Sequence, residues 1–186
     1  MLGTAGFRVG FMADRPMAAF LRGINVGGHR AVAMSDLRAV FSGLGLGNVR
    51  TLLQSGNVVF TTSDGAARLR SILEATCAER LGHDISVILR TEPEMKKVVA
   101  RNPFGQAAGQ PAKVHVVFLA DKPTAAAAAK LDKQRGAPEE WVLDGRHVYV
   151  WYPNGAGQSK LRLDLGVPAT ARNWNTVTKV LDLMNA

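Results

Sequence analysis

The sequence contains a single cysteine, Cys77, and no long apolar segment, and these two absences narrow the class of protein. One cysteine cannot form an internal disulfide, which fits a reducing compartment, so we expect a cytoplasmic protein. A transmembrane helix needs about 20 consecutive apolar residues, and no run approaches that length. The first residues also lack the sustained apolar core of a signal peptide. We therefore expect no association with a membrane.

Several catalytic signatures are missing as well. The four histidines are scattered, with no i, i+4 pair and no carboxylate at ligand spacing, so the sequence predicts no metal site: His29, His83, His115 and His147. There is no G-x-S-x-G motif, and Cys77 lies on the apolar face of a predicted helix. Neither G-x-G-x-x-G nor G-x-x-x-x-G-K-[ST] occurs. The sequence thus names no reaction, leaves open whether the protein is an enzyme, and indicates no cofactor.

The composition is that of a globular protein with an excess of basic residues. Of 186 residues, 47% are hydrophobic and 20% are charged. The net charge of +8 and the isoelectric point near 10.2 favour anionic partners, such as nucleic acid or phosphorylated small molecules. The basic residues are dispersed, without a block of five like charges, so a surface that only confers solubility explains the excess equally well.

Hydrophobic periodicity predicts a mixed fold for the first half of the chain. Residues 1–16 show no period and are predicted to be a disordered N-terminal extension. Apolar runs and helical spacing then predict strands at 17–21, 49–53, 57–61 and 85–89, and helices at 35–41 and 64–81, the latter ended by Gly82. This order, β-α-β-β-α-β, is the split arrangement of ferredoxin-like folds.

The second half repeats part of this plan. We expect helices at 92–99, 124–133 and 177–184, and strands at 114–119, 140–143 and 147–151. Asp144-Gly145 between the last two strands is a strong hairpin signal. The predicted fold class is therefore α+β, with two tandem ferredoxin-like (βαββαβ-type) subdomains at 17–90 and 91–186 and mostly antiparallel sheets.

Two glycine-rich loops have the character of anion sites. The first lies between a predicted strand and a helix, where backbone N–H groups can bind phosphate, and its candidate residues are Arg22, Gly23, Asn25, Gly27 and Gly28. The second, at 153–160, contributes Ser159 and Lys160. The alternative is that both are surface loops whose glycines take positive φ.

Two further segments carry polar side chains suited to a ligand. Gln54-Ser55-Gly56-Asn57 has the composition of a turn and offers Ser55 and Asn57. Arg172-Asn173-Trp174-Asn175 could present a guanidinium, two amides and an indole to a base. Alternatively, Asn173 caps the last helix and Trp174 packs in the core.

Four segments of the sequence resemble a known family. They are Phe20-Leu-Arg-Gly-Ile-Asn-Val-Gly-Gly28, Gln54-Ser-Gly-Asn-Val-Val-Phe60, Asn102-Pro-Phe104 and Thr170-Ala-Arg-Asn-Trp-Asn-Thr-Val177. In this order they resemble the bacterial family called domain of unknown function 1697. The resemblance implies an α+β fold of two ferredoxin-like subdomains and carries no established activity, substrate or catalytic residue. Residues 1–16 fall outside the family pattern.

The leading hypothesis from the sequence is a cytoplasmic protein that binds an anionic ligand, either nucleic acid or a nucleotide-like or phosphorylated molecule. The ligand would lie where six residues converge: Arg22, Asn25, Ser55, Asn57, Arg172 and Asn173. The alternative is an enzyme that acts on a small phosphorylated or carboxylated substrate through Lys160, Ser159 or His29. A third possibility is a protein–protein adaptor that uses an exposed sheet edge. The sequence indicates no oligomeric state.

Overall fold

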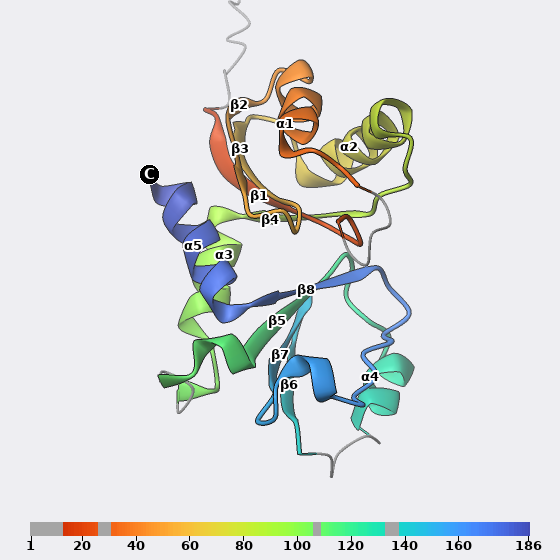
Figure 1. Cartoon of the computed structure of the whole chain (residues 1–186), viewed down its shortest axis with the longest axis vertical. Helices are drawn as coiled ribbons and strands as arrows, with labels where there is room; N and C mark the ends of the chain where they lie inside the picture. The colour runs from red at the N-terminus through yellow and green to blue at the C-terminus, as the bar shows by residue number, and fades with distance from the viewer. Residues whose placement is uncertain (1–12, 26–30, 106–108, 133–137) are drawn as a thin grey trace, which may run out of the picture.

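The computed structural model describes residues 13–25, 31–105, 109–132 and 138–186, and these form two four-stranded antiparallel sheets (Figure 1). The first sheet has the order β2-β3-β1-β4 and is built from β1 (Arg15–Leu21), β2 (Gly47–Leu52), β3 (Asn57–Thr62) and β4 (Val87–Thr91). The second has the order β6-β7-β5-β8 and is built from β5 (Val114–Leu119), β6 (Glu140–Asp144), β7 (His147–Trp151) and β8 (Ala169–Asn173).

Five α-helices accompany the sheets in the described part of the chain: α1 (Met34–Gly43), α2 (Ala66–Leu81), α3 (Glu92–Ala100), α4 (Ala125–Asp132) and α5 (Trp174–Asn185). The two sheets have the same strand order, and each half ends in a helix that follows its last strand. This confirms the predicted α+β class with two ferredoxin-like subdomains. The second half differs at one point, because the short 3₁₀ turn η3 (Ala156–Gln158) stands where the first half has α2. None of the described helices combines the length and the apolar character needed to cross a bilayer.

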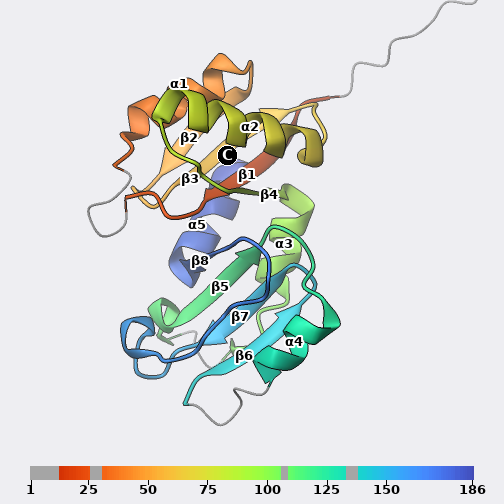
Figure 2. The same ribbon diagram turned by 90° about the vertical axis from the view of Figure 1, so that its right-hand side faces the viewer.

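The helices form three layers, one on the outer face of each sheet and one between the two sheets (Figure 2). α1 and α2 cover the outer face of the first sheet, and α4 covers the outer face of the second. α3 and α5 lie between the two sheets, where α5 contacts β1 and β3 of the first half as well as β5 and β8 of the second. One apolar cluster therefore draws residues from both halves, among them Phe20, Met95, Phe118 and Val180. The halves share this inner core, and the predicted boundary at residue 90 falls inside β4, so the chain forms two sheets around a common core.

Helix boundaries follow from local chemistry. α2 ends where Gly82 takes φ 68°, a left-handed conformation that costs glycine nothing. α3 begins with a capping box, in which the Glu94 carboxylate accepts hydrogen bonds from the N–H and Oγ1 of Thr91. At α5, Asn173 Oδ1 accepts from the N–H of Thr176 at 2.9 Å.

Besides shifts of one or two residues at other helix and strand ends, three differences from the prediction bear on the fold. β1 starts at Arg15, two residues inside the range predicted to be a disordered extension; residues 1–12 of that range lie outside the described part of the chain. β8 is absent from the predicted strands, because none of its five residues has a large apolar side chain: Ala169-Thr-Ala-Arg-Asn173. α5 starts at Trp174 instead of Val177, since Asn173 is both the last residue of β8 and the N-cap of the helix.

The strand registers relate the two halves residue by residue. In the first sheet Ala18 of β1 lies opposite Arg90 of β4, and in the second Val116 of β5 lies opposite Arg172 of β8. The same alignment pairs Phe20 with Phe118, since these residues lie opposite Asn57 and His147, the first residues of β3 and β7. Arg90 and Arg172 therefore occupy equivalent positions in the two halves.

Candidate anion-binding site

Arg172 is buried at the junction of the two halves, and its guanidinium bonds wholly to protein acceptors. Its Nε donates to Asn57 Oδ1 in a short hydrogen bond of 2.5 Å. Its Nη2 donates to the carbonyls of Leu21 and Ser55 at 2.8 and 2.7 Å, and its Nη1 donates to Thr170 Oγ1 and to its own neighbour's carbonyl. A guanidinium has five N–H groups, and all five have partners here. Arg172, predicted as a ligand-binding residue, therefore has no donor left for a ligand.

Arg90 makes part of the same set of contacts in the opposite direction, with three hydrogen bonds, all to backbone carbonyls. From β4 of the first half it donates to the carbonyls of Leu119 and Arg146 in the second half, at 2.8 and 2.6 Å. Arg90 lies 5.6 Å from the ring centroid of Phe118, as Arg172 lies 5.7 Å from that of Phe20. These two rings stack on each other at 4.1 Å. Each half thus sends one arginine into the other, a pair that we call the arginine clamp.

The residues predicted around Arg172 also serve the fold. Asn57 is fully buried, and its Nδ2 donates to the carbonyl of Leu52 and to Ser55 Oγ. Asn173 is used as the cap of α5, as the alternative interpretation held. The structure thus brings Ser55, Asn57 and Arg172 together, as expected, but turns Asn57 and Arg172 inward.

The first glycine-rich loop is tied to the same turn. Asn25, at φ 54°, donates from Nδ2 to the carbonyls of Val32 and Gln54, both at 2.9 Å, and accepts from the N–H of Val32. Arg22 is exposed, and Gly23 takes φ 71°. Gly27, Gly28 and His29 lie outside the described residues.

The second glycine-rich loop is separate from these residues in the fold. It belongs to the segment between β7 and β8, whose leucines pack on the outer face of the second sheet. Lys160 is exposed, while Ser159 Oγ accepts a hydrogen bond from the N–H of Leu161 at 3.1 Å. Within the described residues, no group of three or more His, Cys, Asp or Glu side chains could hold a metal ion.

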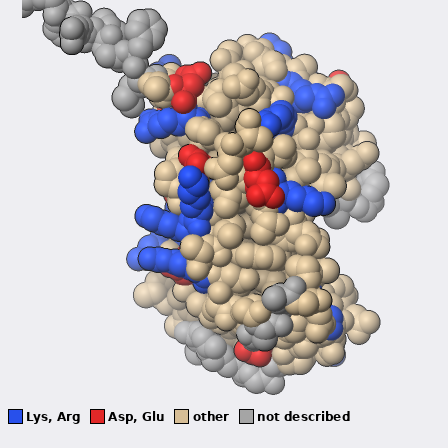
Figure 3. Space-filling model, turned by 90° about the vertical axis from the view of Figure 1, so that its left-hand side faces the viewer, with Lys and Arg blue, Asp and Glu red and all other residues tan. Residues whose placement is uncertain are grey.

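A cavity with stronger charge lies beside Arg90, between α3 and the β6–β7 hairpin. It has a volume of about 130 Å³, and its charged lining consists of Arg90, Glu94, Lys97, Arg101, Asp144 and Arg146. Four cationic groups thus face two carboxylates. On the face formed by α3 and α5, basic side chains gather along one side of the molecule (Figure 3). We call this cavity the basic cavity.

Ion pairs hold the walls of the basic cavity together. Arg146 pairs with Glu94, and Arg101 pairs with Asp144 at 3.3 Å. Burial opposes ionisation of Glu94, but its hydrogen bonds from Thr91 and the charges of Arg146 and Arg90 hold its pKa below the usual value. Lys97 is exposed at the rim, and no described carboxylate forms an ion pair with it.

Burial and neighbouring positive charges both lower the pKa values of the deeper groups, Arg90 and His147. Burial and the neighbouring Arg146 lower the pKa of Arg90 to about 10. Burial also lowers the pKa of His147, against the charge of Asp144 at 3.5 Å, so its ring is neutral near pH 7. Although that distance lies within ion-pair range, the His147 Nε2 is buried and makes no hydrogen bond of acceptable geometry. An anion in the basic cavity would relieve the repulsion between these cationic groups.

Sequence comparison assigns the chain to a family. Residues 15–149 match the family described as protein of unknown function, DUF1697. The chain belongs to the DUF1697 family. This confirms the resemblance carried by its sequence motifs and brings no activity with it. Among curated proteins no match is found.

A solved structure shows the same fold as this DUF1697 protein. It is the conserved bacterial protein SP0830 from Streptococcus pneumoniae, with 23% sequence identity and a TM-score of 0.77. The alignment covers 92% of this chain and 99% of that one. At this level of identity the likeness shows a common architecture alone.

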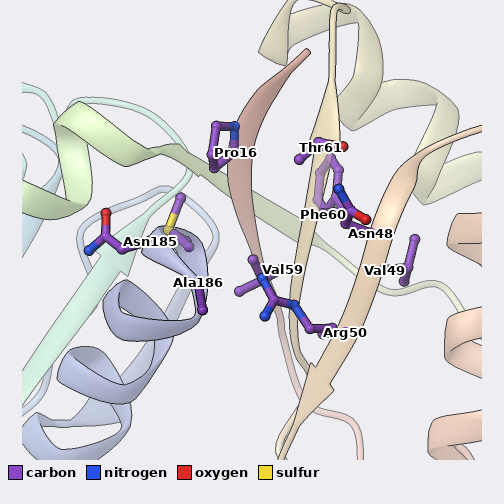
Figure 4. A pocket seen from close by; sticks show the side chains of 10 residues that line it. Pro16, Asn48, Val49, Arg50, Val59, Phe60, Thr61, Asn185 and Ala186 are labelled. Atoms are coloured by element: carbon purple, nitrogen blue, oxygen red, sulfur yellow. The ribbon is translucent and has the colours of Figure 1, made fainter.

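Several cavities among the described residues of this DUF1697 protein are larger than the basic cavity, and two of them illustrate how their lining differs. The largest, of about 480 Å³, lies between the first sheet and the last turn of α5, and Figure 4 shows Arg50 and Asn48 reaching into it from β2. Its one arginine already donates from Nη2 to the carbonyl of Leu183 at 2.5 Å. The second, of about 380 Å³, is lined by Phe104 and Trp174. Neither collects the charge found in the basic cavity.

Sequence reasoning missed the basic cavity, although two signals were present. Lys97 lies in the predicted helix at 92–99, and Arg101 follows it by four residues just past the helix end, so both fall on the same side of that end. The predicted hairpin turn also carries charges of both signs, in Asp144-Gly145-Arg146-His147. Arg90 gave no signal, because a single arginine at the end of an apolar strand is equally typical of an exposed strand end.

Proposed function

We propose that this protein binds a phosphorylated ligand, and that the basic cavity holds its phosphate. The observation that carries the proposal is the convergence of Arg90, Lys97, Arg101 and Arg146 on one small cavity with only two carboxylates. Guanidinium groups bind phosphate oxygens in pairs, and an ammonium adds a mobile point charge. This retains the predicted ligand class and moves the binding site from the glycine-rich loops to the other end of the arginine clamp.

The existing ion pairs support this assignment. The Arg101–Asp144 pair is formed by side chains that are 64% and 34% exposed, and such surface pairs contribute at most about 1 kcal/mol. Arg101 can therefore exchange its carboxylate for a doubly charged phosphate at little cost. Lys97 needs no exchange, because it is exposed and outside the described ion pairs.

The test is calorimetric titration with inorganic pyrophosphate at low and high salt. We expect binding that weakens as salt rises, and an affinity about tenfold lower in Lys97→Ala, since a hydrogen bond to a charged group is worth about 1.5–3 kcal/mol. Lys179→Ala is the matched control, because Lys179 follows Asn173 of α5 by as many residues as Lys97 follows Thr91 of α3. It has the same charge and helix setting but does not line the basic cavity.

The result would go against the proposal in either of two ways. Pyrophosphate binding could be absent at low salt, or Lys97→Ala and Lys179→Ala could lower its affinity equally. The second outcome would indicate diffuse attraction to a protein of net charge +8 instead of a site.

A further inference from the structure

The cavity lined by Phe104 and Trp174 lies beyond the end of α3, where the chain leaves the basic cavity, and the two cavities share no lining residue. It has a volume of about 380 Å³ and is lined by Asn102, Phe104, Gly105, Pro111, Val114, Trp174 and Thr178. Phe104 and Val114 are buried in its wall, whereas Trp174 is half-buried and packs with its inner side on the core shared by the two halves. We call it the aromatic cavity. It carries no charged lining residue.

Two hydrogen-bond donors of the aromatic cavity have no partner within the described residues. Asn102 uses its Oδ1 to accept from the N–H of Phe104 at 3.1 Å, which leaves both hydrogens of its Nδ2 available. The indole N–H of Trp174 has no described acceptor either. Two rings and two unused N–H donors around one cavity match a planar heterocycle with acceptor atoms on its edge.

The chain itself connects the aromatic cavity to the basic cavity. Arg101, which follows the last residue of α3, lines the basic cavity, and Asn102, the next residue, lines the aromatic cavity. A ligand with a ring in one cavity and a phosphate in the other would therefore meet Arg101 between them.

We propose that the aromatic cavity binds the base of a mononucleotide whose phosphates lie in the basic cavity. This inference rests on the proposed function, because it uses the same phosphate site and adds the chemical class of the ligand. The base stacks on the Trp174 ring and accepts a hydrogen bond from the Asn102 Nδ2, while the indole N–H, which lies in the plane of the ring, is left for the ribose. A concave site of about 380 Å³ favours one nucleotide over a strand that runs across a flat surface.

The test compares ADP, adenosine and inorganic pyrophosphate by calorimetric titration of the full chain. ADP should bind at least tenfold tighter than pyrophosphate. Trp174→Leu should weaken ADP about tenfold, as loss of one base–aromatic stack does. The same substitution should leave pyrophosphate affinity unchanged, and Lys97→Ala should weaken both. Trp174→Phe keeps a ring but loses the indole N–H, so it should weaken ADP less than Trp174→Leu does. Thermal melts of both variants show that the core under Trp174 is intact.

The outcomes separate this inference from the one it rests on. If pyrophosphate binds and ADP binds no tighter, or if Trp174→Leu weakens both equally, the base site is refuted and the phosphate site stands. If pyrophosphate fails to bind while adenosine binds and Trp174→Leu weakens it, the phosphate site is refuted and the base site survives alone. If only oligonucleotides bind, the mononucleotide is the wrong ligand class.

Discussion

Replacing Arg172 by alanine should destabilise the whole protein, because the clamp joins both sheets. The substitution removes five charge-assisted hydrogen bonds. Three acceptors then lose the donor that Arg172 supplied: Asn57 Oδ1 and the carbonyls of Leu21 and Ser55. It also removes the stacking of the guanidinium over Phe20. The effect should reach both halves, since the donor lies in the second and these three acceptors lie in the first.

The size of the effect depends on two opposing contributions. Burial lowers the pKa of Arg172 from its ordinary value to about 10, which corresponds to roughly 3 kcal/mol of lost solvation that the substitution would restore. Against this, five hydrogen bonds to a charged group, at the lower value of about 1.5 kcal/mol each, amount to roughly 7 kcal/mol. The hydrogen bonds dominate, and the expected loss in the free energy of unfolding is about 4 kcal/mol.

Urea unfolding and thermal melts followed by circular dichroism measure this loss. For a chain of this length, about 4 kcal/mol corresponds to a decrease in melting temperature of roughly 10 °C. Arg172→Lys should recover only part of it, since lysine keeps the charge but lacks the planar set of donors. Arg68→Ala, at an exposed position of α2, is the control. A melting temperature for Arg172→Ala within 2 °C, roughly, of that control would refute the reasoning.

Three further predictions concern other parts of the fold. Gly56→Ala should cost at least about 1–2 kcal/mol in urea unfolding, because φ is +72° and the new Cβ would lie 2.6 Å from Ile24 Cδ1, whereas Gly157→Ala, with open space around it, should be neutral. Cys77 should resist thiol reagents at pH 8 in the native protein and react fully in urea, since burial and the charge of Glu74 raise its pKa to about 11; rapid native labelling would contradict this. The pKa of His147 in the folded protein lies below its unfolded value of 6.5, so the free energy of unfolding should fall as pH drops below that value. Between pH 7.5 and 5.5, His147→Asn should therefore lose less unfolding free energy than the unaltered protein does.

The sequence predicts the fold better than the site, for a physical reason. Strands such as β5 (Val114–Leu119) and the stop of α2 at Gly82 depend on local properties, apolar runs and backbone conformation, that each segment carries itself. β8 (Ala169–Asn173) could not be predicted from the sequence, because its formation depends on pairing with β5 and not on its own residues. Tertiary context there overrides a weak local pattern.

Whether a polar residue faces a ligand or the interior is also set by tertiary contacts. Ser55, Asn57 and Arg172 were predicted to gather, and they do, but 115 residues separate Asn57 from Arg172, and no local signal shows that their side chains bond to each other. The same limit hid the basic cavity, because Arg90, Lys97 and Arg146 meet only when the hairpin packs on α3.

Comparison of the two clamp arginines shows which nearby charge the clamp itself does not require. In the first half the carbonyl that Leu21 N–H reaches belongs to Gly56, and in the second half the equivalent carbonyl belongs to Arg146. The Arg172 side of the clamp therefore forms with a glycine at this place. Arg146 adds a second cation beside Arg90 and lowers its pKa, which disfavours the charged clamp. The clamp itself therefore requires no charge at residue 146, whose guanidinium pairs with Glu94 and is within reach of the anion proposed for the basic cavity.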